Sequence, residues 1–410
     1  MRALRPGATF DVERLLAPAE GVATYLEAVA PRPPGTERVA LERAVGRILA
    51  ADVRADAFYP ADRRATMDGF AVRSADGRAA RRIVGTIRMG HAPPGPLGAG
   101  EAMRIPTGGV LPAEADAVVP VEDAAEAGEA VSPAASPVPG EYVTPRGDDM
   151  APGETILHGG TRIGAPELSV LATLGIAAPE VFRRPRVAVV STGDELVDTG
   201  AAPGPGQVRD SNRWAIAGCL VALGCEVTHL PRVEDEVEAI GARIAAGLAQ
   251  CDAVVLTGGS SVGARDHVPV AIDAFGPPGV VVHGLRVKPG KPTVLGAAGP
   301  KPLIGLPGNP TSALTILDAI ASDVVRALTG ERAARRATIA ARAGARFDGR
   351  PGWTWYVPAV LDGGDVRPLA LRSSHTSLLA RADGYVVVGP ERVPIEPGET
   401  VALVRYGVAG

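Results

Sequence analysis

Four apolar runs between Arg186 and Leu314 end in polar turns that contain glycine, and this recurrence constrains the fold more than any other feature. The runs with their turns read VAVVSTGDEL, AVVLTGGSSVG, RVKPGKP and LIGLPGNPTSAL. An apolar strand that ends in glycine and leads into a helix presents backbone N–H groups to a phosphate at the carboxyl end of a parallel sheet. The pattern therefore predicts a ligand that resembles a nucleotide or carries phosphate.

Strand and helix patterns alternate from Arg186 onward. We predict strands over 186–191, 225–230, 253–257 and 302–306, and helices over about 212–223, 236–249 and 310–327. Such alternation implies an α/β unit with a mostly parallel sheet and right-handed crossovers.

The segments on either side of the α/β unit show other sequence patterns. Helical spacing predicts helices from Asp11 to Val29, from Val39 to Ala55 with Thr36 as a cap, and from Leu168 to Ile176. Short Val/Ile strands divided by glycine and proline fill the stretch from Pro60 to Arg146, which indicates a small β-rich unit. Five short apolar runs after Gly330 predict a terminal β barrel or sandwich.

Length and composition exclude several classes of protein. A chain of 410 residues suggests three or four structural units. The net charge is only −4 and its charges are interspersed, so we do not expect nucleic acid as a partner. The three cysteines lack CxxC spacing, which argues against a disulfide framework and a zinc site and favours the reducing cytoplasm. No run approaches the roughly 18 apolar residues that span a bilayer, so no membrane is expected.

The turn GLPGNPTSAL is a candidate anion site. Asn309 can cap the following helix and Pro310 can occupy its first position. The N–H groups of Thr311 and Ser312, with the Ser312 hydroxyl, would then be available to an anion. An ordinary capped helix explains this turn equally well.

Two other turns of the α/β unit carry groups that an ordinary turn does not need. TGGSSVGARDHV, from Thr257, combines two glycines, two hydroxyls and the carboxylate of Asp266. STGDE, from Ser191, ends in two acids, and we favour Glu195 for function because Asp194 can simply cap a turn.

The loop RVKPGKP carries two lysines. Lys288 and Lys291 flank a proline and a glycine, and their ammonium groups could neutralise a phosphate or another oxyanion. A solvated surface lysine is the ordinary explanation, and it suits Lys291 better than Lys288.

The β-rich unit holds three further candidates. Asp68 stands beside Gly69 in ATMDGFAVR, Thr107 precedes two glycines in RIPTGGVLP, and Asp148 and Asp149 lie in RGDDMAPGE. Each pattern alone is explained by a turn as readily as by a site.

Together these motifs resemble one family. TMDGFAVR, MRIPTGGVLPAEADAVVPVED, RGDDMAPGE, VVSTGDEL, GQVRDSNRW, LTGGSSVGARD, RVKPGKP and GLPGNPTSAL follow the order found in the molybdopterin molybdenumtransferase family, of the MoeA and gephyrin E-domain type. RSSHTSLLARADGYVVVG, from Arg372, is similar to a segment of that family's last domain.

The resemblance implies a multidomain α/β fold. Its parts would be an elongated, discontinuous α+β linker and dimerisation domain (11–58 and 147–180), a β-rich domain with Asp68 and Thr107 (59–146), a MogA-like α/β molybdopterin-binding domain (181–330) and a C-terminal β-barrel domain (331–410).

The resemblance also implies an activity and partners. The enzyme would take adenylated molybdopterin and molybdate, insert molybdenum into the dithiolene and release AMP, with Mg²⁺ as cofactor. It would be a homodimer in which one subunit's β-rich domain faces the α/β domain of the other. Molybdopterin adenylyltransferase and the proteins that mature molybdoenzymes are further candidate partners.

By the same likeness, the site residues can be assigned. The catalytic residues would be Asp68, Thr107, Asp149, Glu195, Asp266 and Lys288. The substrate-binding residues would be Ser191, Thr192, Gly193, Asp210, Asn212, Gly258, Gly259, Ser261, Gly263, Pro289, Gly290, Lys291, Pro307, Gly308, Asn309, Ser312 and Ser374. Magnesium would be bound by Glu195, Asp235 and Asp266, with Glu236 competing for the position of Asp235. Lys288 and Ser374 would contact molybdate.

Three alternatives stay open. A non-catalytic carrier or scaffold of the same family would not need the acidic residues. Molybdopterin adenylyltransferase is similar to the 186–327 unit only. Molybdate and tungstate cannot be distinguished by sequence. The chain also departs from the family at Arg63 and Arg64, which add positive charge before Asp68, and at His283-Gly284, where a basic residue is expected.

Overall fold

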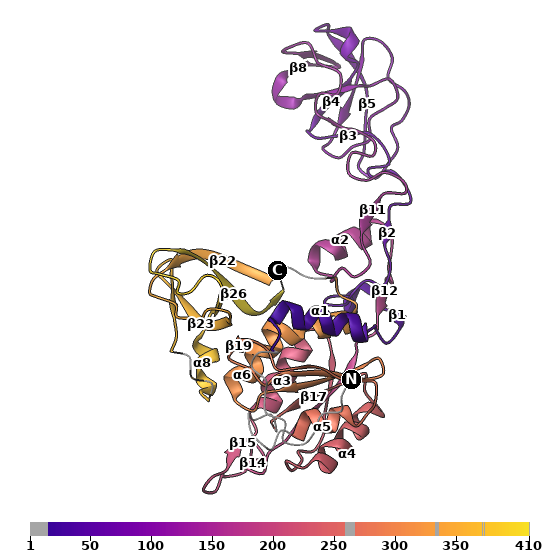
Figure 1. Cartoon of the computed structure of the whole chain (residues 1–410). Helices are drawn as coiled ribbons and strands as arrows, with labels where there is room; N and C mark the ends of the chain where they lie inside the picture. The colour runs from indigo at the N-terminus through magenta and orange to yellow at the C-terminus, as the bar shows by residue number, and fades with distance from the viewer. Residues whose placement is uncertain (1–14, 259–266, 333–335, 371, 373, 410) are drawn as a thin grey trace. The chain divides into compact units, whose positions relative to one another are not determined.

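The computed structural model describes residues 15–258, 267–332, 336–370, 372 and 374–409. The chain divides into two compact units. The major unit comprises residues 1–51, 159–168 and 177–410, and the minor unit comprises residues 52–158 and 169–176. Figure 1 labels the helices and strands of both.

A six-stranded sheet forms the centre of the major unit. Its order is β16-β13-β17-β21-β20-β18, and the bounds are β13 (Arg186–Ser191), β16 (Glu226–His229), β17 (Ala253–Thr257), β18 (Pro278–His283), β20 (Val294–Ala298) and β21 (Lys301–Leu306). The first four strands in this order are parallel, and β20 pairs antiparallel with both β21 and β18, so the predicted mostly parallel sheet is confirmed. The sequence does not predict β18 and β20, whose short runs contain Gly279 and Gly296.

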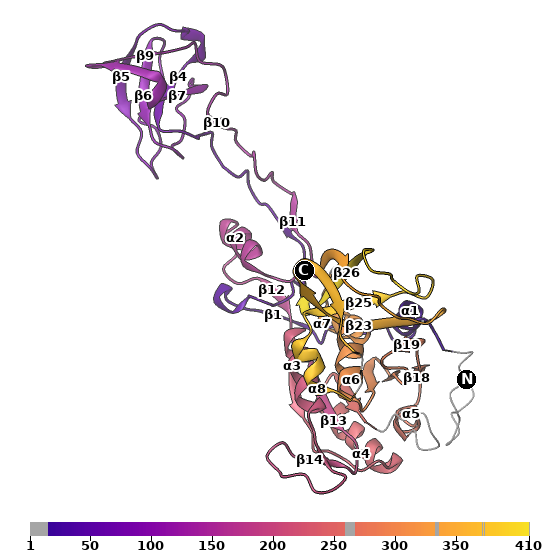
Figure 2. The same cartoon turned by 90° about the vertical axis from the view of Figure 1, so that its left-hand side faces the viewer.

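Helices cover both faces of this sheet (Figure 2). One face carries α1 (Pro18–Val29), α3 (Asn212–Ala222), α6 (Pro310–Ile316), a π-helical turn η5 (Leu317–Ala321) and α7 (Ser322–Thr329), and the other carries α4 (Val237–Leu248) and α5 (His267–Asp273). In β13, Val187 and Val189 pack in the first core and Ala188 and Val190 in the second. Because successive side chains point to opposite faces, a strand buried on both sides is a continuous apolar run.

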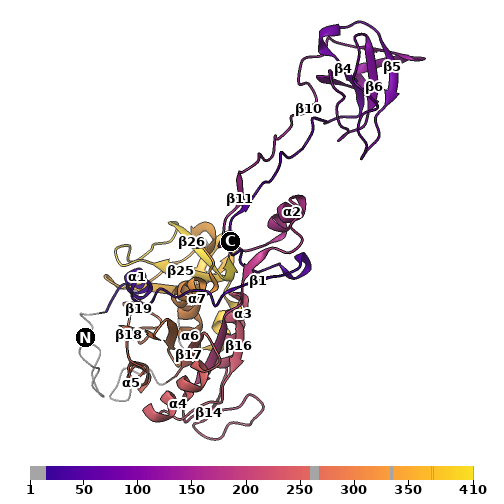
Figure 3. The ribbon, with the colours of Figure 1, turned by 90° about the vertical axis from the view of Figure 1, so that its right-hand side faces the viewer.

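A closed β barrel follows the α/β part, as predicted (Figure 3). Its strands are β22 (Arg336–Ala343), β23 (Thr354–Asp362), β24 (Asp365–Pro368), β25 (Gly384–Val388) and β26 (Thr400–Ala409), and α8 (Thr376–Arg381) lies between β24 and β25 in the chain. The ring closes because β23 pairs with both β24 and β25. A short strand from the α/β part, β19 (Val287–Lys288), joins β23 in parallel.

The predicted helix from Val39 to Ala55 is wrong. Thr36, its expected cap, begins strand β1 (Thr36–Arg38), which pairs with β12 (Glu180–Phe182). Only a 3-10 turn, η2 (Leu41–Arg43), is helical, and Gly46 then has a φ of 74°. Isolated bridges from Ile48 and Leu49 to distant segments satisfy the backbone instead. Tertiary pairing therefore overrides the helical spacing of the apolar residues.

The helix predicted over Asp11 to Val29 is shorter than expected. It begins at Pro18, which occupies the first helical turn, and residues 15–17 precede it without helical structure. The predicted residues 11–14 lie outside the described ranges. None of the described helices combines the length and apolar character needed to cross a bilayer.

The minor unit is rich in β structure, as predicted. A six-stranded sheet has the order β7-β4-β6-β5-β9-β8, with β4 (Gly69–Val72), β5 (Arg81–Thr86), β6 (Glu101–Ile105), β7 (Ala117–Pro120), β8 (Ala124–Ala127) and β9 (Ala130–Pro133). Two short pairs accompany it, β3 (Arg64–Ala65) with β10 (Val143–Thr144) and β2 (Val53–Arg54) with β11 (Thr155–Leu157). Helix α2 (Ala165–Thr173) confirms the helix predicted near Leu168.

Candidate functional site

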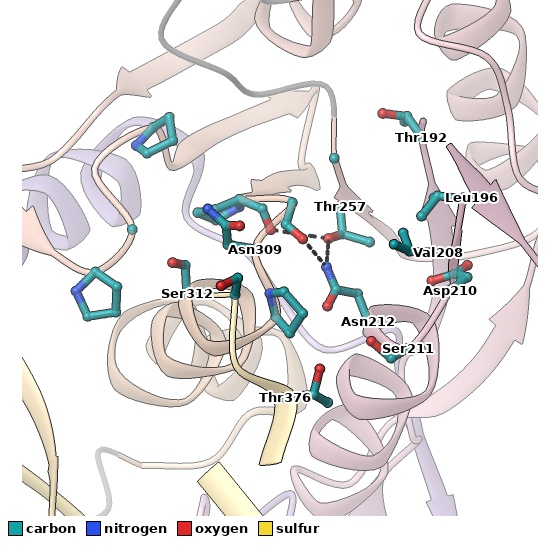
Figure 4. A pocket seen from close by; sticks show the side chains of 18 of the residues that line it. Thr192, Leu196, Val208, Asp210, Ser211, Asn212, Thr257, Asn309, Ser312 and Thr376 are labelled. Atoms are coloured by element: carbon teal, nitrogen blue, oxygen red, sulfur yellow. Dashed lines mark hydrogen bonds between the residues drawn. The ribbon is translucent and has the colours of Figure 1, made fainter. Parts of the chain in front are cut away.

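A cavity of about 1170 Å³ opens at the carboxyl ends of the parallel strands of the major unit. Its walls come from the ends of β13, β17 and β21, the start of α3 and α6, the loop after β19 and residues 374–376 before and in α8 (Figure 4). The lining residues are Thr192, Glu195, Leu196, Val208, Arg209, Asp210, Ser211, Asn212, Asp235, Thr257, Gly258, Val287, Lys288, Pro289, Gly290, Lys291, Pro292, Pro307, Gly308, Asn309, Pro310, Ser312, Ser374 and Thr376.

The end of β17 must be glycine. Gly258 has a φ of 101°, and a Cβ there would lie 2.0 Å from the carbonyl oxygen of Thr192. The absent side chain lets the backbones that follow β13 and β17 approach one another at the cavity.

Asn212 joins helix α3 to the turn after β21. Its Nδ2 donates to Thr257 Oγ1 at 2.9 Å and to the Gly308 carbonyl at 2.7 Å. Thr257 Oγ1 in turn donates to the Pro307 carbonyl at 3.3 Å. Figure 4 shows these bonds across the floor of the cavity. The network holds the Pro307–Gly308 turn in place.

The start of α6 differs from its prediction in one respect. Asn309 is at the N-cap position and Pro310 begins the helix, but the Asn309 side chain makes no capping hydrogen bond. The expected cap is therefore wrong, and the Asn309 amide lines the cavity beside Ser312, whose residue is 3% exposed.

Acidic residues that are adjacent in the sequence line two different cavities. Glu195 and Asp235 line the main cavity, whereas Asp194 and Glu236 line an adjacent cavity of about 660 Å³. Thr192 Oγ1 donates to Asp235 Oδ1 at 2.6 Å and so orients that carboxylate. The lining of the main cavity thus includes the carboxylates of Glu195 and Asp235.

Two lysines lie in the same lining. Lys288 is exposed, and its Nζ lies 3.9 Å from the ring centroid of Trp355 on β23. Between the lysines, Gly290 has a φ of 99°, and a Cβ there would meet Ile316 at 2.1 Å. The loop therefore lies directly against helix α6.

The barrel contributes Ser374 and Thr376 to the lining. The hydroxyl of Thr311, which is fully buried in α6, donates to the His375 carbonyl at 2.9 Å. This bond fastens the segment with Ser374 to the helix that begins at the cavity.

The remaining predicted residues of the major unit have different positions. Asp210 lines the cavity, its Oδ1 accepts from the Arg213 N–H at 3.2 Å, and its Oδ2 is buried without a partner among the described residues. Ser191 is buried behind the cavity wall, and Gly193 lines the adjacent cavity. Gly259, Ser261, Gly263 and Asp266 lie outside the described residues.

In the minor unit, two hydrogen bonds from Thr107 hold the carboxylate of Asp68. Asp68 Oδ1 accepts from the Thr107 backbone N–H at 2.6 Å and from its hydroxyl at 2.9 Å. These two donors hold the pKa of Asp68 below its ordinary value. Arg64 donates to the adjacent Gly108 carbonyl at 2.8 Å. Asp149 is exposed, and its N–H donates to the Tyr59 carbonyl at 3.0 Å.

Sequence reasoning missed several participants. Thr257 and Thr376 line the cavity, and Trp355 contacts the lining residue Lys288. Thr257 could have been suggested by its place directly before the glycine pair. Trp355 carries no such local signal, because its relation to Lys288 depends on strand pairing between distant segments.

Three family models match successive parts of the chain. They are described as "MoeA N-terminal region (domain I and II)" over residues 16–175, "Probable molybdopterin binding domain" over residues 188–327 and "MoeA C-terminal region (domain IV)" over residues 340–405.

Curated relatives and solved structures agree with these models. A molybdopterin molybdenumtransferase of Haemophilus influenzae is 30% identical over 391 residues, covering 92% of this chain and 95% of the relative. One of Nostoc sp. is 35% identical over 305 residues, covering 72% and 70%. A crystal structure of the molybdopterin biosynthesis MoeA protein from Pyrococcus horikoshii is 31% identical with a TM-score of 0.76, covering 96% of this chain and 99% of the other. A second one, at 22% identity and a TM-score of 0.84 with 96% and 100% covered, supports the fold.

Proposed function

Because the chain belongs to the MoeA family of molybdopterin molybdenumtransferases, which act in molybdenum cofactor biosynthesis, we propose that it takes adenylated molybdopterin and molybdate, inserts molybdenum into the dithiolene and releases AMP. One observation carries this proposal. The lining of one cavity combines the carboxylates of Glu195 and Asp235, the ammonium-bearing Lys288 and Lys291, and the glycine-containing turn at Pro307 to Asn309. A substrate with several phosphate charges and an incoming oxyanion needs both basic groups and a cation held by carboxylates.

We assign the substrate phosphates to the turns at Gly258 and at Pro307 to Ser312. Gly258 leaves its backbone accessible, and the Asn212 network fixes the second turn before ligand binds. Preformed N–H and hydroxyl donors bind an anion without a further ordering cost. Gly259, Ser261 and Gly263, which lie outside the described residues, stay predicted substrate-binding residues.

A magnesium ion is the cofactor that we propose for the acidic wall. Glu195 and Asp235 offer oxygen ligands, which Mg²⁺ prefers, and the ion usually takes only one or two carboxylates together with substrate phosphates. Within the described ranges no three acidic, His or Cys side chains are gathered to bind a metal alone, which suits an ion completed by substrate and by Asp266. The bound ion would neutralise charge on the phosphoanhydride.

Lys288 and Ser374 are the residues that we assign to molybdate. Lys288 supplies a point charge and Ser374 a hydroxyl from the barrel segment that Thr311 fastens. A charged N–H donor and a neutral O–H donor suit a tetrahedral dianion.

Asp68, Thr107 and Asp149 are further catalytic candidates, and we propose that the chain works as a homodimer. The two donors of Thr107 lower the pKa of Asp68 and so stabilise its carboxylate form, which a role in binding a cation would use. Light scattering of the purified chain at working concentrations tests the assembly, since a mass of one chain would contradict the dimer.

Single-turnover release of AMP tests the function. Purified protein is mixed with adenylated molybdopterin and Mg²⁺, with molybdate added or omitted. We expect prompt release only with molybdate, and its loss in Glu195→Gln and in Asp266→Ala. Tight binding without release would favour a carrier or scaffold, and formation of adenylated molybdopterin from ATP would favour an adenylyltransferase. Tungstate in place of molybdate tests the oxyanion preference.

A further inference from the structure

Strand β19 joins the lining of the cavity to the barrel, because its residues line the cavity and pair with β23. Lys288 lies at its end and pairs directly with Trp355 in the parallel β19–β23 register. The Lys288 Nζ then lies over the indole, 3.9 Å from the ring centroid. Lys288 thus lines the cavity while its ammonium rests on a side chain of the barrel.

We propose that Trp355 is a positioning residue that holds the Lys288 ammonium at the cavity so that it can bind the oxyanion substrate. The inference rests on the proposed function, because it assumes that the anion at Lys288 is molybdate. It adds a residue of the barrel that does not itself line the cavity.

An indole face is suited to this task. A lysine ammonium is a compact charge on a flexible four-carbon stem, so an exposed lysine has many rotamers. The negative face of an indole attracts the ammonium and restrains it. Unlike a carboxylate, the indole does not cancel the charge, and the N–H groups that point away from the ring stay available to an anion. Among the ion pairs of the described residues, none involves Lys288.

The competing explanation is packing alone. Trp355 is half-buried and packs against the barrel core. A purely structural tryptophan would affect unfolding and kcat without a specific effect on molybdate. The experiment must therefore separate molybdate affinity from stability.

The chain offers a matched control in Trp353. This second indole also lies under a cation, with the Arg350 guanidinium 5.1 Å from its ring centroid, but neither residue lines the cavity. We compare Trp355→Leu, Trp355→Phe and Trp353→Leu, each alone and with Lys288→Ala. The readouts are kcat and the KM for molybdate in AMP release, together with thermal unfolding.

The expected result is selective. Trp355→Leu should raise the KM for molybdate about three- to tenfold with a smaller change in kcat, as expected for the loss of one cation–π contact. Trp355→Phe should recover part of the loss, and Trp353→Leu should match the wild type. In the Lys288→Ala background, Trp355→Leu should add nothing further. The proposal would be overturned if Trp355→Leu and Trp353→Leu raised the KM for molybdate equally. It would also be overturned if Trp355→Leu raised this KM by the same factor in the Lys288→Ala background.

Direct titration with molybdate alone separates this inference from the proposed function. Calorimetry of the unliganded chain should show weaker molybdate binding by Trp355→Leu than by the wild type, even if no AMP is released. Binding without AMP release would contradict the insertase and leave Trp355 as an oxyanion-site residue. Molybdate that binds wild type and Trp355→Leu equally, or binds neither, would contradict the role of Trp355.

Discussion

At the scale of single residues, the direction of each side chain decides which acid belongs to the candidate site. Glu195 and Asp235 face the main cavity, and Asp194 and Glu236 face the adjacent one. The sequence favours Glu195 only because Asp194 has an ordinary alternative role, and it leaves Asp235 and Glu236 in competition. The backbone at Gly193, with a φ of 147°, turns the chain between the two cavities.

Gly258→Ala should destabilise the chain and weaken substrate binding. The new Cβ would need the space of the Thr192 carbonyl, and the φ of 101° disfavours any side chain. We expect a loss of more than about 1 kcal/mol in the free energy of unfolding, measured by urea titration.

Gly241→Ala is the matched control. Gly241 lies within α4, and a Cβ there would meet no atom within 4 Å. Alanine should stabilise the chain by about 0.5–1 kcal/mol, because glycine is the poorer helix former. If both variants lose stability equally, the close approach at Gly258 is not the cause.

Thr107→Val should raise the pKa of Asp68 without restoring it fully. Valine removes the hydroxyl donor but keeps the backbone N–H, which is the stronger cause of the lowered pKa. The native carboxylate contributes stability above the unfolded pKa, and this contribution is lost as pH falls through the lowered folded pKa. In the variant this contribution is smaller, and its loss on acidification is complete at a higher pH because the folded pKa is higher.

A carbon-detected NMR titration of the Asp68 carboxyl measures this shift directly. Thr107→Ser keeps both donors and should retain the wild-type pKa. A valine variant with an unchanged pKa would show that the hydroxyl contributes nothing.

At the scale of elements, buried runs and turn residues predict most of the α/β part. Three of the four parallel strands, β13, β17 and β21, are visible because both their faces are buried, which makes them almost continuously apolar. Helical spacing fails between Val39 and Ala55, where Gly46 interrupts the chain and distant strands supply the hydrogen bonds. Local patterns cannot reveal such partners, which lie more than a hundred residues away.

Helix α6 provides a prediction at this scale. Asn309→Ala should leave thermal stability nearly unchanged, because the Asn309 side chain makes no capping bond. A true cap would cost about 1 kcal/mol. Asn212→Ala should cost about 1 kcal/mol, since two acceptors lose their donor.

Thermal unfolding and AMP release of the two variants measure this contrast. Asn212→Ala should also raise the KM for adenylated molybdopterin because the Pro307–Gly308 turn loosens. If Asn309→Ala destabilised the chain more than Asn212→Ala did, Asn309 would be the helix cap after all. Asn212 would then not be the residue that holds the Pro307–Gly308 turn.

At the scale of the whole molecule, the candidate site depends on contacts between parts that are distant in sequence. Motifs predict most of the lining, including Asn212, Lys288 and Ser312. They do not predict the β19–β23 pairing, or the bond from Thr311 to the His375 carbonyl. These contacts bring the barrel to the α/β part, and only the folded chain defines them.

Glu331 joins distant segments of the major unit and gives the last prediction. Its carboxylate accepts two bonds of 2.8 Å from Arg162 and lies 3.3 Å from Arg326, and its side chain is 3% exposed. Glu331→Ala should cost about 3–5 kcal/mol of unfolding free energy, because Arg162 loses its carboxylate and Arg326 keeps only Asp323, at 3.6 Å. Glu396→Ala removes the exposed partner of Arg346 and should cost at most about 1 kcal/mol. Urea titration of both variants decides the matter, since equal losses would mean that Arg162 and Arg326 find other partners or water when Glu331 is gone.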